Sequence, residues 1–461
     1  MSDLNILLAF YGDDFTGSTD TMEILERAGI RTALFIDPPG PEDLARFPDI
    51  QAFGIAGMTR AMAPAQMEEA LRPAFERLRR SGARHIHYKV CSTFDSSPTI
   101  GSIGKAIDVG AEIFRSDFIS LVVAAPPLGR YCAFGNLFAR MGIGSDGQIH
   151  RLDRHPSMSK HPTTPADESD LRMHLAKQTK KSCGLIDILQ IQGDQNIALA
   201  ALQNCVQNND IVLFDALYDH QMRTIGELID RFGTPDKPHF SVGSSGIEMA
   251  LTGFWKDQGI IQPPAAWPEP GEASPLLVLS GSCSPVTARQ IDYALANGFE
   301  EIALDTPAIA AGTHDQTFAD DIERGIQSIR KGKSVIIHTS KSTQDDRFVQ
   351  SHQILKRNGL NATDIQSITA TLYGGALGTI AREIASTTNL HRIVIAGGDT
   401  SGIVARALGI KAVSMMTPLS PGAPLCLAFA PGAAVDGSEV VFKGGQVGGE
   451  EYFEVVRLGK F

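Results

Sequence analysis

Two adjacent carboxylates stand directly after the first apolar run of the chain. Residues 6–10 have the length and composition of a buried strand, Gly12 ends the run, and Asp13 and Asp14 follow it. A single Asp before a helix usually caps that helix, and this role is open to either residue. Two acids at the carboxyl end of a strand also favour a ligand site in an α/β sheet. Phe15 replaces the second acid of an Asp-x-Asp-x-Thr loop, which argues against a phosphatase of that type.

Charged side chains follow two further apolar segments. Lys89 lies near the end of the strand predicted at 85–90, where an ammonium suits a carboxylate or a transferred phosphoryl group. Arg130 comes after the strand predicted at 118–125, and a guanidinium there suits bidentate binding of a carboxylate. The alternatives are a solvated strand-edge lysine and a surface ion pair. Cys91 is more simply explained as a small buried thiol than as a nucleophile.

Three clusters rich in Gly, Ser and Thr occupy the second half of the chain, at residues 280–287, 396–402 and 442–449. Glycines let backbone N–H groups approach phosphate oxygens, and helix N-termini add favourable partial charge. The clusters therefore favour a nucleotide-phosphate site. A P-loop and a Gly-x-Gly-x-x-Gly motif are both missing, which argues against P-loop enzymes and dinucleotide dehydrogenases. Asp399 is placed either to bind a metal or to cap the next helix.

The elements that must position these residues alternate between helix and strand. In the first half we expect helices at 21–28 and 64–80, with Pro73 kinking or breaking the second, and a polar loop at 144–170. Four prolines within 262–274 indicate an interdomain linker. Beyond it the pattern restarts, with a long helical segment at 362–386 that glycines interrupt and a tail of strand character at 426–456.

Composition limits the classes of function. The chain has 461 residues, which predicts two domains. Its net charge of -11, with no Lys/Arg block, argues against nucleic-acid binding. Six scattered cysteines without a CxxC pair indicate neither a zinc site nor a disulfide framework and fit a reducing cytoplasm. We find no signal peptide and no apolar stretch that would span a bilayer, so no membrane partner is expected.

Taken together, the motifs resemble the four-carbon acid sugar kinase family over nearly the whole chain. In the first half the matching elements are Asp-Asp-x-Thr-Gly at 13–17, Pro-x-x-Gly-Arg at 126–130, Thr-Pro-x-x-x-Ser at 164–169 and Gly-Ser-x-Gly at 243–246. In the second half they are Gly-Ser-x-Ser-x-x-Thr at 281–287, Gly-Gly-Asp-Thr at 397–400 and Lys-x-Gly at 443–445. Their order and spacing together are more specific than any one of them.

The resemblance implies an ATP-dependent kinase with two α/β domains, mainly parallel sheets and an interdomain active-site cleft. The expected divisions are a sugar-acid-binding domain at 1–261, a linker at 262–274 and a nucleotide-binding domain at 275–461. The implied nucleotide-binding residues are Ser282, Ser284, Gly397, Gly398, Asp399, Thr400, Gly444 and Gly445. Asp399 is also the candidate ligand of Mg²⁺. The substrate side would carry Asp13, Asp14, Lys89 and Arg130, with Asp14 or Asp13 taking or orienting the hydroxyl proton.

One departure from the family pattern bears on specificity. The family usually has Lys-x-Asp-Ser-Thr-x-Arg-Gly, and here Lys89, Ser92 and Thr93 persist while Cys91 replaces the acid and Asp95 replaces the Arg. Replacing a carboxylate with the Cys91 thiol, and a guanidinium with the Asp95 carboxylate, should change which substrate binds. The departure puts threonate, erythronate and 3-oxotetronate in doubt, and the resemblance then implies a related branch of the family that acts on a branched or oxidised sugar acid such as 3-oxo-isoapionate. The predicted activity is therefore transfer of the ATP γ-phosphoryl group to a terminal hydroxyl of a short sugar acid.

Two other classes stay open from sequence. One is a lyase or dehydrogenase that acts on sugar acids, and the other is a nucleotide-binding sensor without catalysis. The expected partners are the sugar acid and ATP, and homo-oligomerisation is left open.

Overall fold

The computed structural model describes residues 5–141, 147–161 and 163–460, which divide into two compact units. The first comprises residues 1–33 and 38–264, and the second comprises 34–37 and 265–461. The division after residue 264 falls inside the proline-rich segment 262–274. Segment 34–37 belongs to the second unit, where the Ile36 N–H donates to the Lys411 carbonyl at 2.9 Å. The functional limits of the domains and the cleft between them stay predictions.

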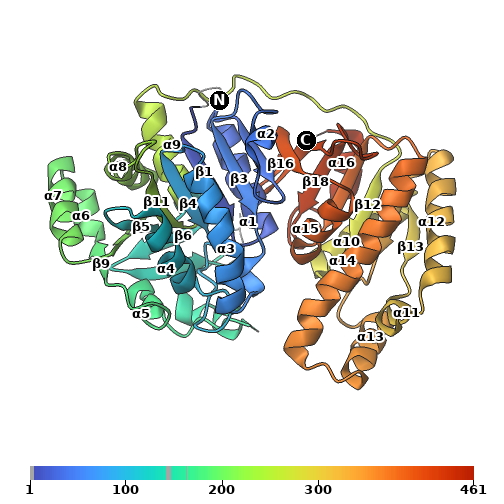
Figure 1. Ribbon diagram of the computed structural model, residues 1–461. Coiled ribbons are helices and arrows are strands. Elements are labelled where there is room, and N and C mark those ends of the chain that lie inside the picture. Colours follow the sequence, from blue (N-terminus) through green and yellow to red (C-terminus); the bar gives the residue numbers. More distant parts are fainter. Residues whose placement is uncertain (1–4, 142–146, 162, 461) are drawn as a thin grey trace. The chain divides into compact units, whose positions relative to one another are not determined.

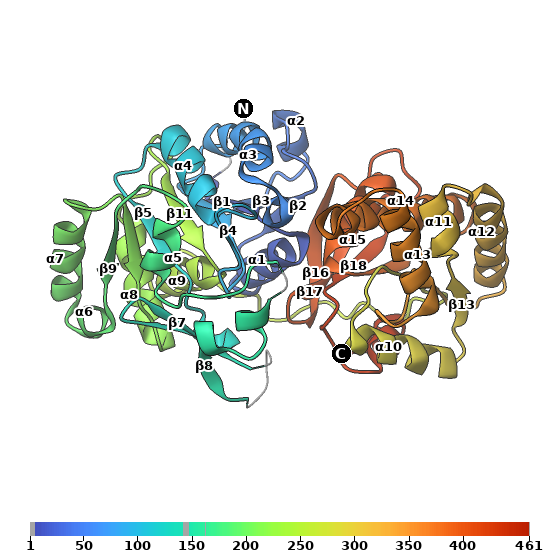
Figure 2. The same cartoon turned by 90° about the horizontal axis from the view of Figure 1, so that it is seen from below.

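The first unit is built on a parallel sheet with strand order β3-β1-β4-β11-β5-β10-β9. Helices α3 and α4 pack together on one side of this sheet, and α1, α8 and α9 lie on the other (Figures 1 and 2). The strands are β1 (Leu8–Gly12), β3 (Ala52–Ala56), β4 (His85–Lys89), β5 (Ile119–Val122), β9 (Cys183–Ile186), β10 (Ile211–Phe214) and β11 (His239–Gly243). Strand β2 (Thr32–Phe35) begins in the first unit and ends in the second.

Helices alternate with these strands along the first unit. They are α1 (Phe15–Arg27), α2 (Pro41–Leu44), α3 (Pro64–Arg79), α4 (Ile103–Phe114), α5 (Leu171–Ala176), α6 (Ile188–Gln192), α7 (Gln195–Val206), α8 (Asp219–Asp230) and α9 (Gly246–Asp257). Short 3₁₀ turns lie at η1 (Thr59–Ala61), η2 (Pro126–Leu128), η3 (Leu152–Arg154) and η4 (Met158–Lys160). A small antiparallel sheet joins β6 (Arg130–Ala133), β7 (Asn136–Arg140) and β8 (Ile149–Arg151).

The second unit has strand order β13-β14-β12-β15-β18-β17-β16, parallel from β13 to β18 and antiparallel for the last two pairs. Its strands are β12 (Leu277–Ser280), β13 (Glu300–Ala303), β14 (Val335–His338), β15 (Arg392–Ala396), β16 (Ala412–Ser420), β17 (Ala423–Phe429) and β18 (Glu439–Lys443). Its helices are α10 (Pro285–Ala296), α11 (Thr306–Ala311), α12 (Asp315–Arg330), α13 (Asp346–Arg357), α14 (Ala362–Thr387), α15 (Gly398–Ala407) and α16 (Tyr452–Leu458). The predicted α/β class with mainly parallel sheets is confirmed.

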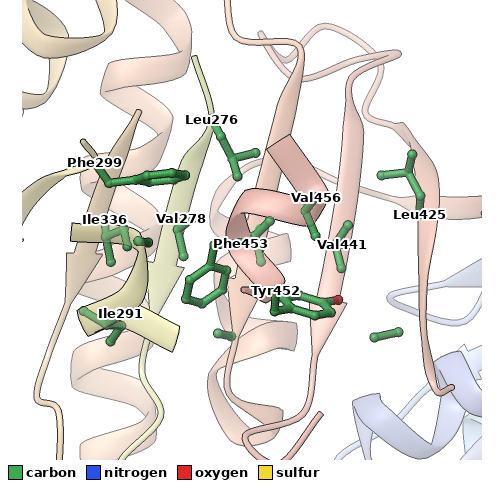
Figure 3. Close-up of a cluster of buried hydrophobic side chains, with 14 residues drawn as sticks. Leu276, Val278, Ile291, Phe299, Ile336, Leu425, Val441, Tyr452, Phe453 and Val456 are labelled. Carbon is green, nitrogen blue, oxygen red and sulfur yellow. The ribbon is translucent and has the colours of Figure 1, made fainter. Parts of the chain in front are cut away.

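A buried apolar cluster holds α10 and α16 against the sheet of the second unit (Figure 3). Ile291 comes from α10, Phe453 and Val456 from α16, and Val278 and Val441 from the strands. All five are fully buried, and burying side chains of this size stabilises the fold by roughly 1.5–3 kcal/mol each. This packing fixes the start of α10 and the segment before α16, which border the glycine-rich loops.

Several predicted boundaries are wrong for identifiable reasons. Helix α1 begins at Phe15 instead of residue 21, because the polar residues after Asp14 form its first turns. Pro73 does not break α3, since it lies on the exposed face, where the hydrogen bond it cannot make faces water. The segment 144–170 was expected to be a loop, but its described part contains β8, η3 and η4.

Two further corrections concern the second unit. Helix α14 runs without interruption from Ala362 to Thr387. Its glycines allow close packing on α15: a Cβ on Gly378 would lie 2.4 Å from the Ala407 Cβ, and one on Gly374 would lie 3.0 Å from Ile403. The tail is not all strand, because α16 buries Tyr452, Phe453 and Val456 at helical spacing.

Candidate active site

Asp13 and Asp14 occupy the turn between β1 and α1, at the carboxyl edge of the first parallel sheet. Asp14 is the N-cap of α1: its Oδ1 accepts the Gly17 N–H at 2.7 Å. Gly12 ends β1, and a Cβ there would lie 2.0 Å from the Ser18 Oγ, so the close approach of α1 favours glycine at this position. The capping role that the sequence left open is therefore real for Asp14. Its second carboxylate oxygen remains available for other contacts.

Arg60 joins the two carboxylates, and sequence reasoning missed it. Its guanidinium lies 2.7 Å (Nη2) and 3.1 Å (Nε) from the two carboxylate oxygens of Asp13, and Nη1 lies 2.6 Å from the Asp14 Oδ2. The Arg60 N–H also donates to the Asp13 carbonyl at 3.0 Å. Arg60 lies just after β3, which neighbours β1 in the sheet. A basic residue after an adjacent parallel strand was the available signal, but strand order cannot be read from the chain.

Burial dominates the electrostatics of this turn. Asp13 is 3% exposed, and burial raises its pKa, with the Asp14 charge adding to the rise while Arg60 counteracts it. Asp20, in the second turn of α1, also has a raised pKa because of burial, opposed by Lys89 and by a hydrogen bond from Ser245. The site therefore holds several acids whose ionisation depends on the cations beside them.

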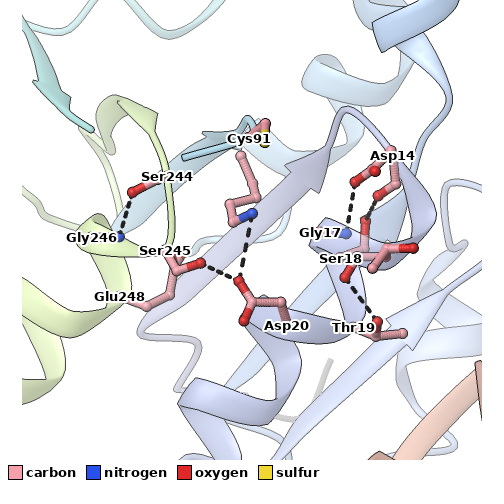
Figure 4. Close-up of polar contacts among 12 residues, drawn as sticks. Asp14, Gly17, Ser18, Thr19, Asp20, Cys91, Ser244, Ser245, Gly246 and Glu248 are labelled. Atoms are coloured by element: carbon pink, nitrogen blue, oxygen red, sulfur yellow. Dashed lines mark hydrogen bonds and ion pairs between the residues drawn. The ribbon is translucent and has the colours of Figure 1, made fainter. Parts of the chain in front are cut away.

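Lys89 reaches the same turn from the end of β4. A Cβ placed on Gly17 would lie 2.6 Å from the Asp14 Oδ1 and 3.0 Å from the Lys89 Nζ. The Lys89 ammonium therefore lies beside the Asp14 carboxylate, which caps α1. The Lys89 Nζ is 3.8 Å from the Asp20 Oδ2, which also accepts a hydrogen bond from the Ser245 Oγ (Figure 4). Lys89 is 3% exposed, so it is not the solvated strand-edge lysine that was the alternative.

A buried His87–Glu248 pair lies in the core near this network. The His87 Nδ1 is 2.5 Å from the Glu248 Oε1, and its Nε2 donates to the Gly243 carbonyl at 3.2 Å. Both ring nitrogens of His87 are therefore hydrogen-bonded, one to a side chain of α9 and one to the end of β11. Both side chains are fully buried, and the Glu248 charge contributes to the raised pKa of Asp20. Neither residue was predicted, because two isolated core residues give no sequence motif.

The segment after β4 carries the residues that depart from the family pattern. The Cys91 Sγ lies 2.9 Å from the Thr93 Oγ1, and burial followed by the Asp95 charge raises the Cys91 pKa to about 11. Such a thiol stays protonated at neutral pH, in line with the small buried thiol preferred from sequence. Asp95 follows Phe94, whose φ of 57° is unusual for a bulky residue. Its Oδ1 is buried and has no hydrogen-bond partner among the described residues.

Arg130 lies close enough to this segment to interact electrostatically with Cys91 and Asp95. Its Nη1 donates to the carbonyls of Leu128, Gly129 and Arg140 at 3.1, 3.3 and 3.2 Å. Burial lowers the Arg130 pKa, and its Nε is buried without a partner in the described part of the chain. Arg130 is thus no surface ion pair. Cys91 also interacts with Arg60, so the predicted substrate residues gather around one region of the first unit.

The three glycine-rich loops of the second unit converge at the ends of β12, β15 and β18. A Cβ on Gly281 would lie 2.6 Å from the Thr400 Cγ2, and one on Gly397 would lie 2.7 Å from the Thr400 Oγ1. A Cβ on Gly445 would lie 2.7 Å from the Ser282 Oγ. A Cβ at any of these three positions would collide with a side chain of these loops, so glycine is what lets the loops pack this closely. The loops therefore form a cradle of backbone suited to close approach by phosphate oxygens.

Side chains of α10 hold the third loop in place. The Thr287 Oγ1 donates to the Gly445 carbonyl at 2.9 Å, and the Gln290 Nε2 donates to the carbonyls of Val447, Gly448 and Gly449 at 2.8–3.1 Å. Ser284 caps α10 by accepting the Val286 N–H at 3.2 Å. The N-terminus of α10, with its partial positive charge, thus borders the cradle.

Helix α15 opens on the second loop. Gly397 is its N-cap, with a φ of 132°, and its carbonyl accepts hydrogen bonds from the Thr400 and Ser401 hydroxyls. Asp399 therefore lies within the helix, and the alternative that it caps α15 is wrong. Its side chain lies outside the described residues, as do any metal contacts it makes. Elsewhere in the described chain no group of three or more His, Cys, Asp or Glu is arranged to hold a metal ion.

Comparisons with known proteins match the whole chain. The family model described as "Sugar-binding N-terminal domain" matches residues 8–251, and the model described as "Nucleotide-binding C-terminal domain" matches residues 277–453. The chain is 41% identical to a 3-oxo-isoapionate kinase of Paraburkholderia graminis, covering 99% of this chain and 95% of the relative. It belongs to the four-carbon acid sugar kinase family.

Other members of this sugar kinase family are more distant. A 3-oxo-tetronate kinase of Pseudomonas savastanoi pv. phaseolicola is 28% identical over 97% of this chain and 96% of its own, and one of Pseudomonas fluorescens is 29% identical over 97% and 95%. A solved structure from Salmonella typhimurium LT2 shares the fold, with a TM-score of 0.74 at 24% identity and 98% of each chain covered. A Haemophilus influenzae structure matches with a TM-score of 0.69 at 20% identity, covering 97% of this chain and 98% of its own.

In this protein, the predicted site residues form two groups, one on each unit. Asp13, Asp14, Lys89, Arg130 and the 91–95 segment gather on the first, although Ser92 and Thr93 have no assigned substrate contact. The nucleotide residues gather on the second, at the convergence of its three loops. Their individual roles stay predictions. Within the described part of the chain, no helix is both long and apolar enough to cross a membrane.

Proposed function

We propose that this sugar acid kinase phosphorylates a terminal hydroxyl of 3-oxo-isoapionate, with ATP as the phosphoryl donor and Mg²⁺ as the accompanying ion. The observation that carries the choice of substrate is the 41% identity over 99% of the chain to a 3-oxo-isoapionate kinase, against 28–29% for the 3-oxo-tetronate kinases above. Cys91 and Asp95 support it, because they replace an acid and an Arg of the usual family pattern beside the substrate residues.

The acceptor hydroxyl would meet Asp14, which takes or orients its proton. The Oδ1 of Asp14 is held by the Gly17 N–H and its Oδ2 by Arg60, so the carboxylate has a fixed orientation. Proton transfer to a positioned carboxylate typically contributes about 10²–10⁴-fold to the rate. Lys89, beside Asp14, would stabilise the charge on the transferred group, and Arg130 would bind the substrate carboxylate through its unused Nε edge.

The glycine loops would hold the ATP phosphates through backbone N–H groups and the N-termini of α10 and α15. The support for such a ligand is that Gly281, Gly397 and Gly445 expose backbone at the ends of three neighbouring strands, where a Cβ would collide with Thr400 or Ser282. When bound, Mg²⁺ would neutralise charge on the phosphate oxygens. Phosphoryl transfer needs alignment and charge neutralisation more than covalent participation of the protein.

An ATP-consumption assay with a panel of sugar acids tests the proposal. The panel should hold 3-oxo-isoapionate, 3-oxo-tetronate, threonate and erythronate, with and without EDTA. We expect the highest kcat/KM for 3-oxo-isoapionate and loss of activity in EDTA. A preference for 3-oxo-tetronate would reject the substrate while retaining the kinase. ADP binding without turnover of any acid would instead favour a nucleotide sensor.

A further inference from the structure

Lys443, the last residue of β18, is a buried lysine without a carboxylate partner among the described side chains. It is 1% exposed. Two of its three N–H donors are used: Nζ donates to the Gly444 carbonyl at 3.0 Å and to the Thr287 Oγ1 at 3.2 Å. Nζ also lies 5.6 Å from the centre of the Tyr452 ring. Every one of these partners is neutral, which is costly for a buried ammonium.

Most charged side chains on the elements around Lys443 form ion pairs of their own. These pairs are Arg289–Glu450 and Asp292–Lys341 at α10, Arg392–Glu439 between β15 and β18, Arg457–Glu454 on α16, and Arg406–Asp37 from α15. Glu451, at the start of α16, is exposed to solvent. The side chain of Asp399, on α15, lies outside the described residues. Burial accordingly lowers the Lys443 pKa to about 7, so near neutral pH a large share of the lysine is uncharged.

Lys443 is also connected directly to the third glycine loop. It contacts the Gly444 carbonyl, and the Thr287 hydroxyl that accepts its hydrogen bond in turn donates to the Gly445 carbonyl at 2.9 Å. The lysine thus supports both glycines of the loop. The Lys443 carbonyl accepts the Gly397 N–H at 2.9 Å, which ties the same residue to the second loop.

We propose that Lys443 is a positioning residue of the nucleotide site, whose side chain takes up a proton from solvent when anionic phosphates bind the adjoining loops. This inference rests on the proposed function, which places ATP on these loops. A bound anion would supply the negative charge that the described surroundings of the ammonium lack, and so would favour its protonated form. By linkage, protonation then favours nucleotide binding to the same extent.

Isothermal titration calorimetry of ADP binding tests this at pH 8, where the phosphates of ADP are ionised. Repeating the titration in buffers of different ionisation enthalpy gives the number of protons taken up. We expect the wild-type protein to take up nearly one proton per ADP, and its Kd to rise about tenfold per pH unit between pH 7.5 and 8.5. A purely structural lysine would produce neither effect.

Lys443→Gln is the informative variant, because its shorter side chain keeps hydrogen-bond donors beside Gly444 and Thr287 but cannot titrate. We expect K443Q to bind ADP without proton uptake, whereas Lys333→Met, which alters an exposed lysine paired with Glu300, keeps the wild-type value. Equal uptake in K443Q and the wild type overturns the inference, and so does a wild-type uptake near zero. If K443Q does not fold, the number of protons that the wild-type protein takes up per ADP tests the inference by itself. Absence of ADP binding by the wild type would instead count against the proposed nucleotide role.

Discussion

Replacing Asp14 with Asn separates the chemistry of this carboxylate from its structural role. Asn caps helices about as well as Asp, so its side-chain oxygen can keep the 2.7 Å bond from the Gly17 N–H. What Asp14→Asn loses is the negative charge at Oδ2, which accepts the Arg60 Nη1 at 2.6 Å. A hydrogen bond between charged groups contributes roughly 1.5–3 kcal/mol when buried. The Asp14 side chain is 24% exposed and Arg60 29%, so solvent reduces the expected loss to about 1 kcal/mol.

We therefore expect D14N to fold, with a melting temperature lower by about 2–4 °C for a unit of this size. If Asp14 takes the hydroxyl proton, kcat should fall by about 10²–10⁴-fold while the KM for ATP changes little. The assay is coupled ADP release with saturating sugar acid, alongside differential scanning calorimetry. A kcat within threefold of the wild type, in a protein of normal stability, would remove Asp14 from the chemistry.

Asp194→Asn provides the matched control. Asp194 caps α7 by accepting the Asn196 N–H at 2.7 Å, and it is exposed and remote in sequence from the site residues. D194N should leave kcat unchanged, which shows that an Asp-to-Asn change at a cap does not by itself lower turnover. Asp13→Asn is less informative, because breaking a buried ion pair costs about 3–5 kcal/mol and confounds activity with folding.

Three further predictions test the specificity segment and the nucleotide loops. The double variant C91D/D95R restores the usual family residues. It should shift the ratio of kcat/KM for 3-oxo-tetronate to that for 3-oxo-isoapionate by about tenfold or more in favour of 3-oxo-tetronate. An unchanged ratio in the sugar-acid panel would count against a role of these two positions in specificity. Burial raises the Cys91 pKa to about 11, so iodoacetamide should label this thiol at pH 8 at least about a hundredfold more slowly than in the unfolded chain. The labelling rate, followed by peptide mass spectrometry, should increase as the pH rises toward 11. Rapid labelling at pH 8 would contradict this prediction. Gly445→Ala places a Cβ 2.7 Å from the Ser282 Oγ and should raise the KM for ATP. The control is Gly375→Ala on α14, where a Cβ meets no atom within 4 Å. This control should leave the KM for ATP unchanged and stabilise the helix by about 0.5–1 kcal/mol.

The sequence was informative where a local pattern carried the chemistry. The acids after β1, the lysine ending β4 and the glycine clusters after β12 and β15 are local features, and their positions at strand ends follow from alternation of strand and helix. Arg60 could not be found this way, because its contact with Asp13 depends on β3 lying beside β1. The His87–Glu248 pair is likewise a long-range contact between elements that give no joint signal.

Helix interruptions were mispredicted because propensity was weighed without tertiary context. Gly374 and Gly378 weaken an isolated helix, yet in α14 they allow contact with Ile403 and Ala407 of α15, and this packing outweighs the propensity cost. The start of α1 was placed too late because the prediction relied on apolar periodicity. Its first turns are polar, and the Asp14 cap and burial of Ser18 stabilise them where apolar periodicity gives no sign.

The charges around Asp14 also indicate which cation is suited to the substrate carboxylate. Arg60 is engaged by Asp13 and Asp14, and Lys89 lies in an ion pair with Asp20. Either cation would have to give up a carboxylate partner to bind another anion. Arg130 differs, because the acceptors of its Nη1 are backbone carbonyls and its buried Nε has no partner among the described residues. A bound carboxylate would satisfy that Nε and neutralise a guanidinium whose pKa burial already lowers. We therefore propose Arg130 as the cation for the acid end of the substrate, with Lys89 beside the transferred phosphoryl group.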